Sequence, residues 1–361
     1  MITVKEIAKR CNVSPSTVSN ILNGKSNVGA ETRSRVMACV KETGYQPNYF
    51  ARSMRKQNSH VISIITEDLT VFGTNPMVEA IMAHCEMNDY RTILMNLRLY
   101  RKWGSSWYHE SEKLKASVAP VIQEALSIKV DGVIYVAGHC RLIDCFPADF
   151  PIPTVIAYGL SKDHKYPSVI IDDEKGGYDT AKYLVAKGHR NIGIIAGVAD
   201  NLHVKYRLLG YQKALFEEGV PFNPSWVSYG KWHRKSGYEA AKKLGCDGIT
   251  ALFCMNDDMA AGAYDYLYEQ GLEIGRDISI IGYDNMALAD YLRPSLTTSE
   301  IPLSGIGKKA AEILLDTLKG EKNRAQPAQV VRMPCTMIER RSVAALHTAG
   351  RAVWENQPHE E

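Results

Sequence analysis

Two hydrophobic periods divide the chain into a short N-terminal part and a long remainder. In residues 1–46, apolar positions recur every three to four residues, which is the period of amphipathic helices. From residue 61 onward, short continuous apolar runs alternate with amphipathic helical stretches. Such runs are typical of parallel strands that are buried on both faces. The pattern therefore predicts a small all-α region followed by a much larger α/β core.

Three helices are predicted in residues 1–46, and each has its own end signals. Thr3 and Glu6 have the spacing of a capping box at the start of the first helix. Ser14 followed by Pro15 marks the start of the second helix, because serine is a favoured N-cap and proline is tolerated at the first helical position. The third helix runs through "ETRSRVMACVKET" and ends at Gly44.

The second helix, "PSTVSNIL", has one apolar face and one polar face. Its apolar face is formed by Val18, Ile21 and Leu22. Its outward face is formed by short hydrogen-bonding side chains, which are Ser16, Thr17 and Asn20. Groups of this size can enter a DNA groove. Helix, tight turn, helix and a supporting third helix together predict a helix-turn-helix domain in residues 1–46.

Charge separates the same two regions. Residues 1–60 contain ten Lys and Arg against three acidic residues, whereas the remainder contains 33 basic and 37 acidic residues. The net charge of +3 therefore conceals a basic arm on a mildly acidic body, which is the electrostatic pattern of a nucleic-acid-binding domain. Charge alone fits a solvated basic helix pair equally well. The order of the helix signals and the polar face of the second helix favour DNA binding.

The stretch "PNYFARSMRK" (47–56) combines basic residues with an apolar stripe formed by Phe50, Ala51 and Met54. An isolated helix of about ten residues is marginal in water. We therefore expect this helix to need a partner to pack against, and we interpret residues 47–60 as a hinge helix and linker.

Nine apolar runs predict the strands of the core. The first set is "VISIIT" (61–66), "RTILMNL" (91–97), "GVIYVAG" (132–138) and "PTVIAYG" (153–159), and the second is "PSVIID" (167–172), "NIGIIAG" (191–197), "WVSYG" (226–230), "ALFCM" (251–255) and "ISIIGYD" (278–284). Two sets predict two doubly wound lobes with parallel sheets. Ligands of such sheets bind beyond the carboxyl ends of the strands, so we expect a ligand cleft between the lobes.

Polar and aromatic side chains follow these strand ends, where core packing would not place them. They are Asp68, Phe72, Asn75, His139, Asn201, His203, Arg207, Trp232, Asn256, Asp257 and Asp284. Each one has an ordinary structural explanation, because Asp and Asn cap helices and form turns, and a Trp is commonly a core residue. Their convergence on one edge of the predicted sheets favours an effector-binding site.

Other features of the sequence argue against several classes of protein. No apolar run reaches the length of roughly 18 residues that a membrane span needs, and no secretory signal is present at the N-terminus. The eight cysteines form no C-x-x-C pair, so we expect reduced thiols in a cytoplasmic protein and neither a metal nor a cofactor. No G-x-S-x-G, H-E-x-x-H or P-loop signature occurs, so we expect no enzyme. An exported sugar-binding protein is disfavoured by the missing signal and by the helical head.

The motifs of this chain resemble those of the LacI/GalR family of bacterial repressors. "TVKEIAKRCNVSPSTVSNILNG", "ETRSRV", "GYQPN" and "ARSM" are similar to the DNA-binding head of that family. "GHRNIGIIAG", "RLLGYQKAL", "FCMNDDMAAGA", "DISIIGYDN", "LRPSLTT" and "IERRSV" are similar to its effector-binding core, which has a periplasmic-binding-protein-like fold. The resemblance covers about residues 2–341. It implies a homodimeric transcriptional regulator that binds pseudo-palindromic operator DNA.

For the head, the resemblance implies contacts to bases and to phosphates. Base contacts in the major groove are implied for Pro15, Ser16 and Asn20, and positions near phosphates for Thr17, Ser19, Asn23 and Tyr45. The other residues that we expect at the DNA interface are Thr3, Ser14, Asn48, Ala51, Met54 and Arg55. In the family the hinge helix folds only on operator DNA, and a leucine from each subunit wedges between base pairs in the minor groove. This sequence has Met54 at that position, and methionine is also a wedge residue.

For the core, the resemblance implies that Arg207 and Asp284 hold polar groups of the effector. Asn256 and Asp257 line the same cleft, and the ring at position 232 stacks on the ligand. An aromatic face together with Arg, Asp and Asn suits a sugar, so we expect a carbohydrate effector and a repressor of carbohydrate-utilisation genes. A purine stays open, because purine-binding relatives also have an aromatic ring at the position of Trp232.

The expected domains are the head (1–46), the hinge (47–60), the core (61–341) and a C-terminal tail (342–361). Within the core, we expect an N-lobe of residues 61–161 and 286–322 and a C-lobe of residues 162–285 and 323–341. The stretch 98–116 is longer than the usual connection in the family, and it is either a surface loop or a lid over the ligand. The tail has no heptad of leucines, which favours a dimer over a tetramer.

Overall fold

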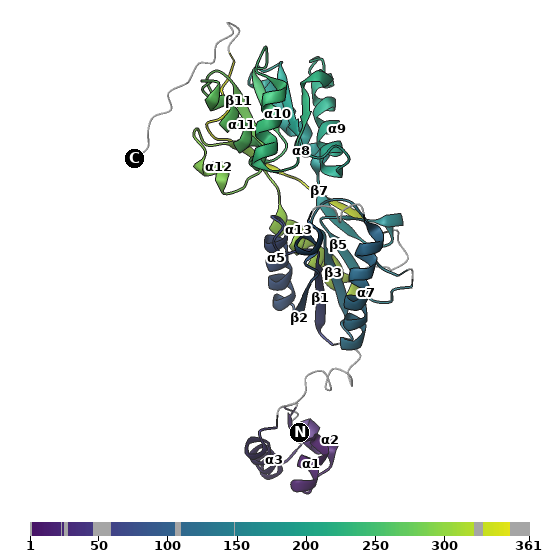
Figure 1. Cartoon of the computed structure of the whole chain (residues 1–361). Coiled ribbons are helices and arrows are strands. Elements are labelled where there is room, and N and C mark those ends of the chain that lie inside the picture. Colours follow the sequence, from purple (N-terminus) through teal and green to yellow (C-terminus); the bar gives the residue numbers. More distant parts are fainter. Residues whose placement is uncertain are drawn as a thin grey trace, which may run out of the picture. The chain divides into compact units, whose positions relative to one another are not determined.

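The computed structural model describes residues 2–22, 24, 28–45, 59–104, 110–147, 149–320 and 328–346. The chain divides into two compact units, one containing the N-terminal head up to His60 together with Leu126–Asp131, and the other containing the rest of the chain (Figure 1). Several predicted features lie outside the described residues. They are the hinge helix with Asn48, Ala51, Met54 and Arg55, the side chain of Asn23, residues 105–109 of the long connection, and the tail beyond residue 346.

The head consists of α1 (Val4–Arg10), α2 (Pro15–Leu22) and α3 (Ala30–Thr43). Thr3 and Glu6 form the predicted capping box, and α3 ends at Gly44 in the left-handed conformation. The buried side chains of the head are Ile7, Ala8, Cys11, Val18, Ile21 and Val36. All three helices contribute to this small core. The predicted apolar face of α2 is confirmed, with Val18 and Ile21 buried and Leu22 partly buried.

The N-lobe contains a six-stranded parallel sheet with the order β13-β7-β5-β3-β1-β2. Its strands are β1 (Val61–Thr66), β2 (Arg91–Asn96), β3 (Gly132–Val136), β5 (Thr154–Ala157), β7 (Ser168–Ile171) and β13 (Val330–Met333). Its helices are α5 (Thr74–Met87), α6 (Leu99–Trp103), α7 (Ser111–Ile128) and α13 (Leu303–Leu318). Helices α5 and α13 pack together on one face of the sheet, and α7 lies on the other (Figure 1). The short strands β4 (Leu142–Ile143) and β6 (Leu160–Ser161) pair separately and precede η2 (Lys162–His164).

The C-lobe contains a second six-stranded sheet with the order β14-β12-β11-β10-β8-β9. Its strands are β8 (Ile192–Ala196), β9 (Val227–Tyr229), β10 (Ala251–Cys254), β11 (Ser279–Asp284), β12 (Thr297–Glu300) and β14 (Thr336–Ile338), of which only β14 is antiparallel to its neighbour. Its helices are α8 (Asp173–Ala186), α9 (Leu202–Glu217), α10 (Arg234–Leu244), α11 (Asp257–Glu269) and α12 (Leu288–Tyr291), with η3 (Pro224–Trp226) before β9.

The chain passes from one lobe to the other three times, between β7 and α8, between β12 and α13, and between β13 and β14. These crossings differ from the expected lobe boundaries at 161/162, 285/286 and 322/323. Strand β7, which we had grouped with the second lobe, pairs with β5 and β13 in the first sheet. A fully apolar strand fits the interior of either sheet, so its pattern alone does not indicate which one it joins.

Helices α8 and α9 cross with their backbones in contact. A Cβ at Gly210 would lie 1.7 Å from the carbonyl oxygen of Glu174, and a Cβ at Gly177 would lie 2.1 Å from the carbonyl oxygen of Arg207. Only glycine permits this approach. The crossing places the first turn of α8 beside the first two turns of α9, which is where the candidate site lies.

The described helices include none that combines the length and the apolar character needed to span a bilayer.

Candidate functional site

The start of α2 carries a cluster of three hydroxyl groups. Ser14 Oγ accepts a hydrogen bond from the Thr17 N–H at 3.1 Å and thereby caps the helix. It also lies 2.6 Å from Ser16 Oγ and 2.8 Å from Thr17 Oγ1. Ser14 and Ser16 are exposed. The helix start therefore presents hydroxyl groups together with its partial positive charge to any anion that approaches.

The outward face of α2 contains the predicted DNA-reading residues. Val18 and Ile21 are buried against the head core, which directs Ser16 and Asn20 to the opposite side, and Pro15 is exposed at the first position of the helix. Ser19 and Asn20 are half-exposed, and Tyr45 packs against the head core. The side chain of Thr3 is engaged with Glu6 in the capping box, with the Thr3 hydroxyl 2.9 Å from Glu6 Oε2.

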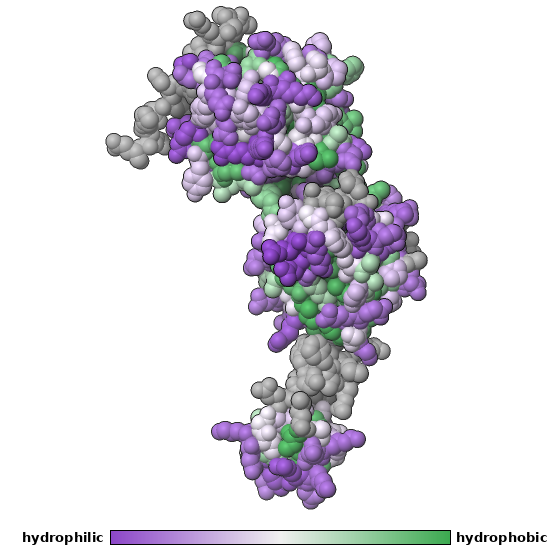
Figure 2. All heavy atoms as spheres, viewed as in Figure 1, coloured by the Kyte–Doolittle hydropathy of each residue, from purple (hydrophilic) through white to green (hydrophobic). Residues whose placement is uncertain are grey.

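Basic side chains surround this helical head. Lys5, Lys9 and Arg10 are exposed on α1, and Arg35 is exposed on α3. Hydrophilic residues predominate on the face of the head that Figure 2 shows. Cations on the surface of so small a domain favour association with a polyanion.

A buried carboxylate organises the second candidate site, in the core. Asp173, the first residue of α8, accepts hydrogen bonds from Arg207 Nε at 2.8 Å and from His203 Nδ1 at 2.7 Å. The Cys140 N–H donates to His203 Nε2 at 3.1 Å, so Nε2 is the acceptor nitrogen and Nδ1 carries the proton that faces Asp173. Cys140 follows β3 of the N-lobe, whereas Asp173 and His203 belong to helices of the C-lobe. His203 therefore joins the two lobes.

Arg207 is held on three sides. Besides Asp173, it donates from Nη1 to the Met255 carbonyl at 2.5 Å, and its guanidinium lies 3.6 Å from the centre of the Tyr283 ring. It is only 2% exposed. Nε and one N–H of Nη1 carry these bonds, so the donors left for a ligand are Nη2 and the second N–H of Nη1.

Asp284 follows Tyr283 at the carboxyl end of β11. Burial raises the pKa of its carboxyl well above the usual range, although the nearby Arg207 acts in the opposite direction. Its backbone φ of +106° is a value that residues other than glycine rarely adopt. Strain of this kind is often found at functional sites, where the surrounding structure enforces it.

Trp232 lies flat against Gly197, at the carboxyl end of β8. A Cβ at Gly197 would be 2.1 Å from the indole ring, so glycine is required there. Asn256 Nδ2 donates to the Trp232 carbonyl at 3.0 Å, and Asn256 Oδ1 caps α11 by accepting from the Met259 N–H at 2.9 Å. Asn256 thus positions Trp232 through the Trp232 carbonyl. Both polar atoms of the Asn256 side chain form hydrogen bonds within the protein.

Asp257 is fully buried and also engaged. Its carboxylate accepts from the Thr298 hydroxyl at 2.6 Å and from the Met286 N–H at 2.7 Å. Burial raises its pKa to about 7 in spite of these hydrogen bonds. Asp257 therefore fixes the segment directly after Asp284. Asn256 and Asp257 are predicted to line a ligand cleft, and in the structure the side chains of both are hydrogen-bonded to protein groups.

The predicted residues of the N-lobe are less closely connected to this cluster. Asp68 stabilises a local turn, accepting from the Thr70 N–H at 2.9 Å and from the Thr70 hydroxyl at 2.7 Å. Phe72 is 43% exposed and Asn75 is also exposed. His139 is different, because it immediately precedes Cys140, and burial together with the nearby His203 and Arg141 lowers its pKa to about 3. In the C-lobe, Asn201 caps α9 by accepting from the His203 N–H at 2.8 Å.

Sequence reasoning missed Asp173 and Tyr283, which hold Arg207, and it also missed Glu67. The buried Glu67 carboxylate accepts from the Tyr135 hydroxyl at 2.7 Å and pairs with Arg141, which fixes the ends of β1 and β3 together. The signal for Asp173 was present as the Asp172-Asp173 pair after an apolar run. It was indistinguishable from ordinary helix capping, and Asp172 is indeed the N-cap of α8.

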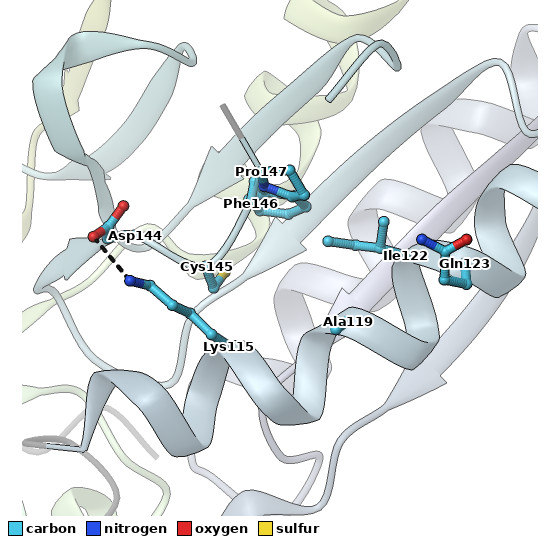
Figure 3. A pocket seen from close by; sticks show the side chains of 8 residues that line it. All are labelled: Lys115, Ala119, Ile122, Gln123, Asp144, Cys145, Phe146 and Pro147. Carbon is cyan, nitrogen blue, oxygen red and sulfur yellow. Dashed lines mark ion pairs between the residues drawn. The ribbon is translucent and has the colours of Figure 1, made fainter. Parts of the chain in front are cut away.

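A pocket of about 340 Å³ lies in another part of the N-lobe, between α7 and residues 144–147 (Figure 3). Ile122, Phe146 and Pro147 line it. Lys115 and Asp144, its charged residues, face each other at 3.6 Å, and Asp144 also pairs with Lys162. Among the described residues, no group of three or more His, Cys, Asp and Glu is arranged to hold a metal ion.

Two family models match parts of this chain. The family described as "Bacterial regulatory proteins, lacI family" matches residues 3–48, and the "Periplasmic binding protein-like domain" matches residues 181–343. The HTH-type transcriptional repressor PurR of Escherichia coli O1:K1 is 33% identical over 349 residues, which cover 95% of this chain and 97% of that protein. The protein of the same name from Shigella sonnei has the same identity and coverage.

Solved structures agree with this relationship. The lac repressor dimer bound to operator and the anti-inducer ONPF is 26% identical, with a TM-score of 0.75 over 94% of this chain and 98% of that chain. The lac repressor bound to ONPG in the repressed state has a TM-score of 0.74 at the same identity, over 95% of this chain and 99% of that chain.

Proposed function

This chain belongs to the lacI family of bacterial regulatory proteins, and on that premise we propose that it is a repressor whose affinity for operator DNA changes when a small ligand binds at the Arg207 cluster. Family membership makes it a DNA-binding transcriptional regulator and not an enzyme. The observation that carries the proposal is the buried group of Asp173, His203 and Arg207 where the two lobes meet.

The DNA-binding half of the proposal rests on α2. Its first turn presents Ser16 and the other hydroxyl groups, and its outward face presents Asn20. In the major groove, Ser16 and Asn20 on the outward face and Pro15 at the exposed start of the helix would contact base edges with their short side chains. Thr17, Ser19 and Tyr45 would lie near phosphates. A homodimer would place two such helices on the half-sites of a pseudo-palindrome.

The ligand-binding half rests on Arg207, Asp284 and Trp232. Arg207 Nη2 can donate to a ligand oxygen, and the Asp284 carboxyl can bind a ligand hydroxyl in either protonation state. The indole of Trp232, backed by Gly197, offers a flat surface for the C–H face of a ring. This chemistry suits a sugar, and we propose a carbohydrate as the first candidate effector. A purine base is the second candidate, because an indole can stack on a flat base and Arg207 and Asp284 can pair with its polar edge.

His203 supplies a route from the ligand to the lobes. It contacts Asp173, the partner of Arg207, and through Cys140 it contacts the N-lobe. A ligand that displaces Arg207 would therefore change the hydrogen bond between His203 and the Cys140 N–H, which joins the lobes. Coupling of this kind requires only that the ligand bind one lobe arrangement better than another.

The test begins with selection of a duplex from a random-sequence library by the full-length protein. Gel shifts on that duplex are then repeated with single mono- and disaccharides and with single purine bases. We expect at least one of these compounds to change the affinity, and we expect Arg207→Ala to abolish that response while the variant still binds the duplex. Arg276→Ala, which removes a surface arginine of the same lobe, is the control and should keep the response. Failure to enrich any duplex over random DNA would contradict the DNA-binding half.

A further inference from the structure

Two cysteines lie on facing elements of the head. Cys11 ends α1 as its C-cap residue and is 2% exposed, whereas Cys39 lies in α3 and is half-buried against the same hydrophobic core. Cys11 Sγ lies 3.9 Å from the Arg35 carbonyl oxygen. Arg35 is one helical turn before Cys39, so the Cys11 side chain points at the face of α3 that carries Cys39. Both cysteines belong to the same small hydrophobic core of the head. The other six cysteines all belong to the core unit.

The two thiols differ in their access to solvent. Burial raises the pKa of the Cys11 thiol, and its contact with Cys39 adds to the effect, so Cys11 stays protonated and protected. Cys39 is half-buried and can be reached by a small oxidant. An accessible cysteine with a second cysteine on the facing helix allows a sulfenic acid to be converted to a disulfide.

We propose that Cys11 and Cys39 form a reversible disulfide in the presence of a peroxide, and that this disulfide lowers the affinity of the head for DNA. The Cys39 thiolate attacks hydrogen peroxide, forms a sulfenic acid and releases hydroxide. The Cys11 sulfur then attacks the sulfenic sulfur, and the hydroxyl group leaves as water with the Cys11 proton. One peroxide is reduced to two waters in all, and two thiols are oxidised to one disulfide. An excess of a small thiol reverses the reaction by exchange.

The effect on DNA binding follows from where Cys11 lies. A covalent bond brings two sulfur atoms much closer together than a non-bonded contact does. The end of α1 must therefore move toward α3. Asn12 follows immediately with a φ of +46°, and Ser14 caps α2 two residues later. A shift at Cys11 is thus passed through a short turn to the start of the helix that would read DNA. Hydrogen bonds to base edges weaken steeply once they are displaced or tilted.

The first measurement detects the bond itself and does not depend on DNA. The full-length protein is reduced, treated with hydrogen peroxide, blocked with N-ethylmaleimide and digested with trypsin. We expect a cross-linked pair formed by the peptide that starts at Cys11 and the peptide VMACVK that contains Cys39, and we expect dithiothreitol to remove it. Cys39→Ser should lack the product. Absence of this pair from oxidised wild type would overturn the proposal.

The second measurement tests the consequence, which rests on the proposed DNA binding. Fluorescence anisotropy with the selected duplex should show at least a tenfold weaker affinity after peroxide treatment and full recovery with dithiothreitol. Cys39→Ser should be insensitive to peroxide, and Cys246→Ser, which removes a partly buried thiol of the core, should respond like wild type. Cys11→Ser changes a buried residue and can fail to fold. In that case the test relies on Cys39→Ser alone. A cross-link without any change in affinity would also overturn the proposal. Failure of the reduced protein to bind DNA would instead contradict the proposed function.

Discussion

Arg207 and Asp173, which balances its charge, are both buried. Asp173 is 1% exposed and is the only described carboxylate that accepts a hydrogen bond from this guanidinium. Removal of one partner of a buried pair leaves an uncompensated charge, which costs about 3–5 kcal/mol. We therefore expect Asp173→Ala to lower the free energy of unfolding by that amount in urea denaturation. Asp179→Ala, on the same helix, removes a surface pair with Lys175 and should cost less than about 1 kcal/mol. Equal losses in the two variants would contradict the buried pair.

The raised pKa of Asp257 leads us to expect that stability depends on pH. Burial raises its pKa from 3.8 to about 7, so the folded protein keeps this proton at a higher pH than the unfolded chain does. The stability contributed by this group is therefore complete below about pH 4 and is lost as the pH rises through 7. Asparagine can donate to the Thr298 oxygen and still accept from the Met286 N–H, without a charge.

We expect Asp257→Asn to be more stable than wild type at pH 8 and the difference to shrink toward pH 5. Each pKa unit corresponds to about 1.4 kcal/mol, so the gain at pH 8 is on the order of a few kcal/mol. Urea unfolding at several pH values measures it. Asp265→Asn, on the same helix, is the control, because Asp265 forms a surface pair with Arg234 and should show no such trend. A pH-independent difference between Asp257→Asn and wild type would show that ionisation of this group is not the cause.

The sequence singles out a candidate site residue only where its type is unusual for its place. Arg207 and His203 follow an apolar strand and a turn, where they have no routine structural role, and the structure brings both onto Asp173. Asp173 was not predictable, because an Asp at a helix start is ordinary and its pairing depends on the contact between α8 and α9. Asn256 and Asp257 stay predictions as ligand contacts. They follow the carboxyl end of β10, and their side chains also form hydrogen bonds within the protein, which the sequence pattern does not reveal.

At the scale of elements, the crossing of α8 and α9 determines the position of the site. A methyl group at Gly210 would meet the Glu174 carbonyl oxygen at 1.7 Å and the Tyr178 nitrogen at 2.9 Å. The two helices would have to separate, and overpacking of this kind costs typically about 1–3 kcal/mol or more. We expect Gly210→Ala to lower the melting temperature and to weaken any ligand response, because Arg207 lies one turn earlier on the same helix. Leu209→Ala, at the neighbouring half-exposed position, should change neither property. A Gly210→Ala protein as stable as wild type would mean that the helices can move apart freely.

The elements that pattern predicted well are those in the middle of the sheets. β1, β3, β8, β10 and β11 are almost fully buried, and their apolar runs have no other explanation. The sequence reading missed β12, β13 and β14. Their sequences, "TTSE", "VVRM" and "TMI", are short or polar, because β13 and β14 are edge strands and β12 lies next to an edge. Strands of this kind gain stability from a neighbouring backbone, which no local pattern reveals.

At the scale of the whole molecule, the core is two similar lobes connected by three chain crossings and by the His203 hydrogen bond to Cys140. The crossings are short, since only Asp172 separates β7 from α8 and two residues separate β13 from β14. Short connections let the lobes tilt about one region while each keeps its own sheet intact. A ligand that bonds to Arg207 and Asp284 on one lobe and reaches residues near His139 on the other would therefore favour one tilt.

The uneven distribution of charge along the chain leads to the last prediction, which concerns binding of the full-length protein to DNA. Residues 1–60 hold ten Lys and Arg against three acids, so phosphate contacts should release several counterions per subunit. Each contact contributes about −0.9 to the slope of log K against log salt, and we expect a steep slope.

Asn20→Ala removes an uncharged group, so it should leave that slope unchanged. The substitution should weaken binding by roughly 1–3 kcal/mol on the selected duplex and by little on random DNA. Asn223→Ala, which alters a cap in the core, should change neither quantity. Salt titrations by fluorescence anisotropy on both duplexes separate these effects. A flat salt dependence would contradict DNA binding by the basic head, and equal weakening of Asn20→Ala on both duplexes would place Asn20 at a phosphate instead of a base.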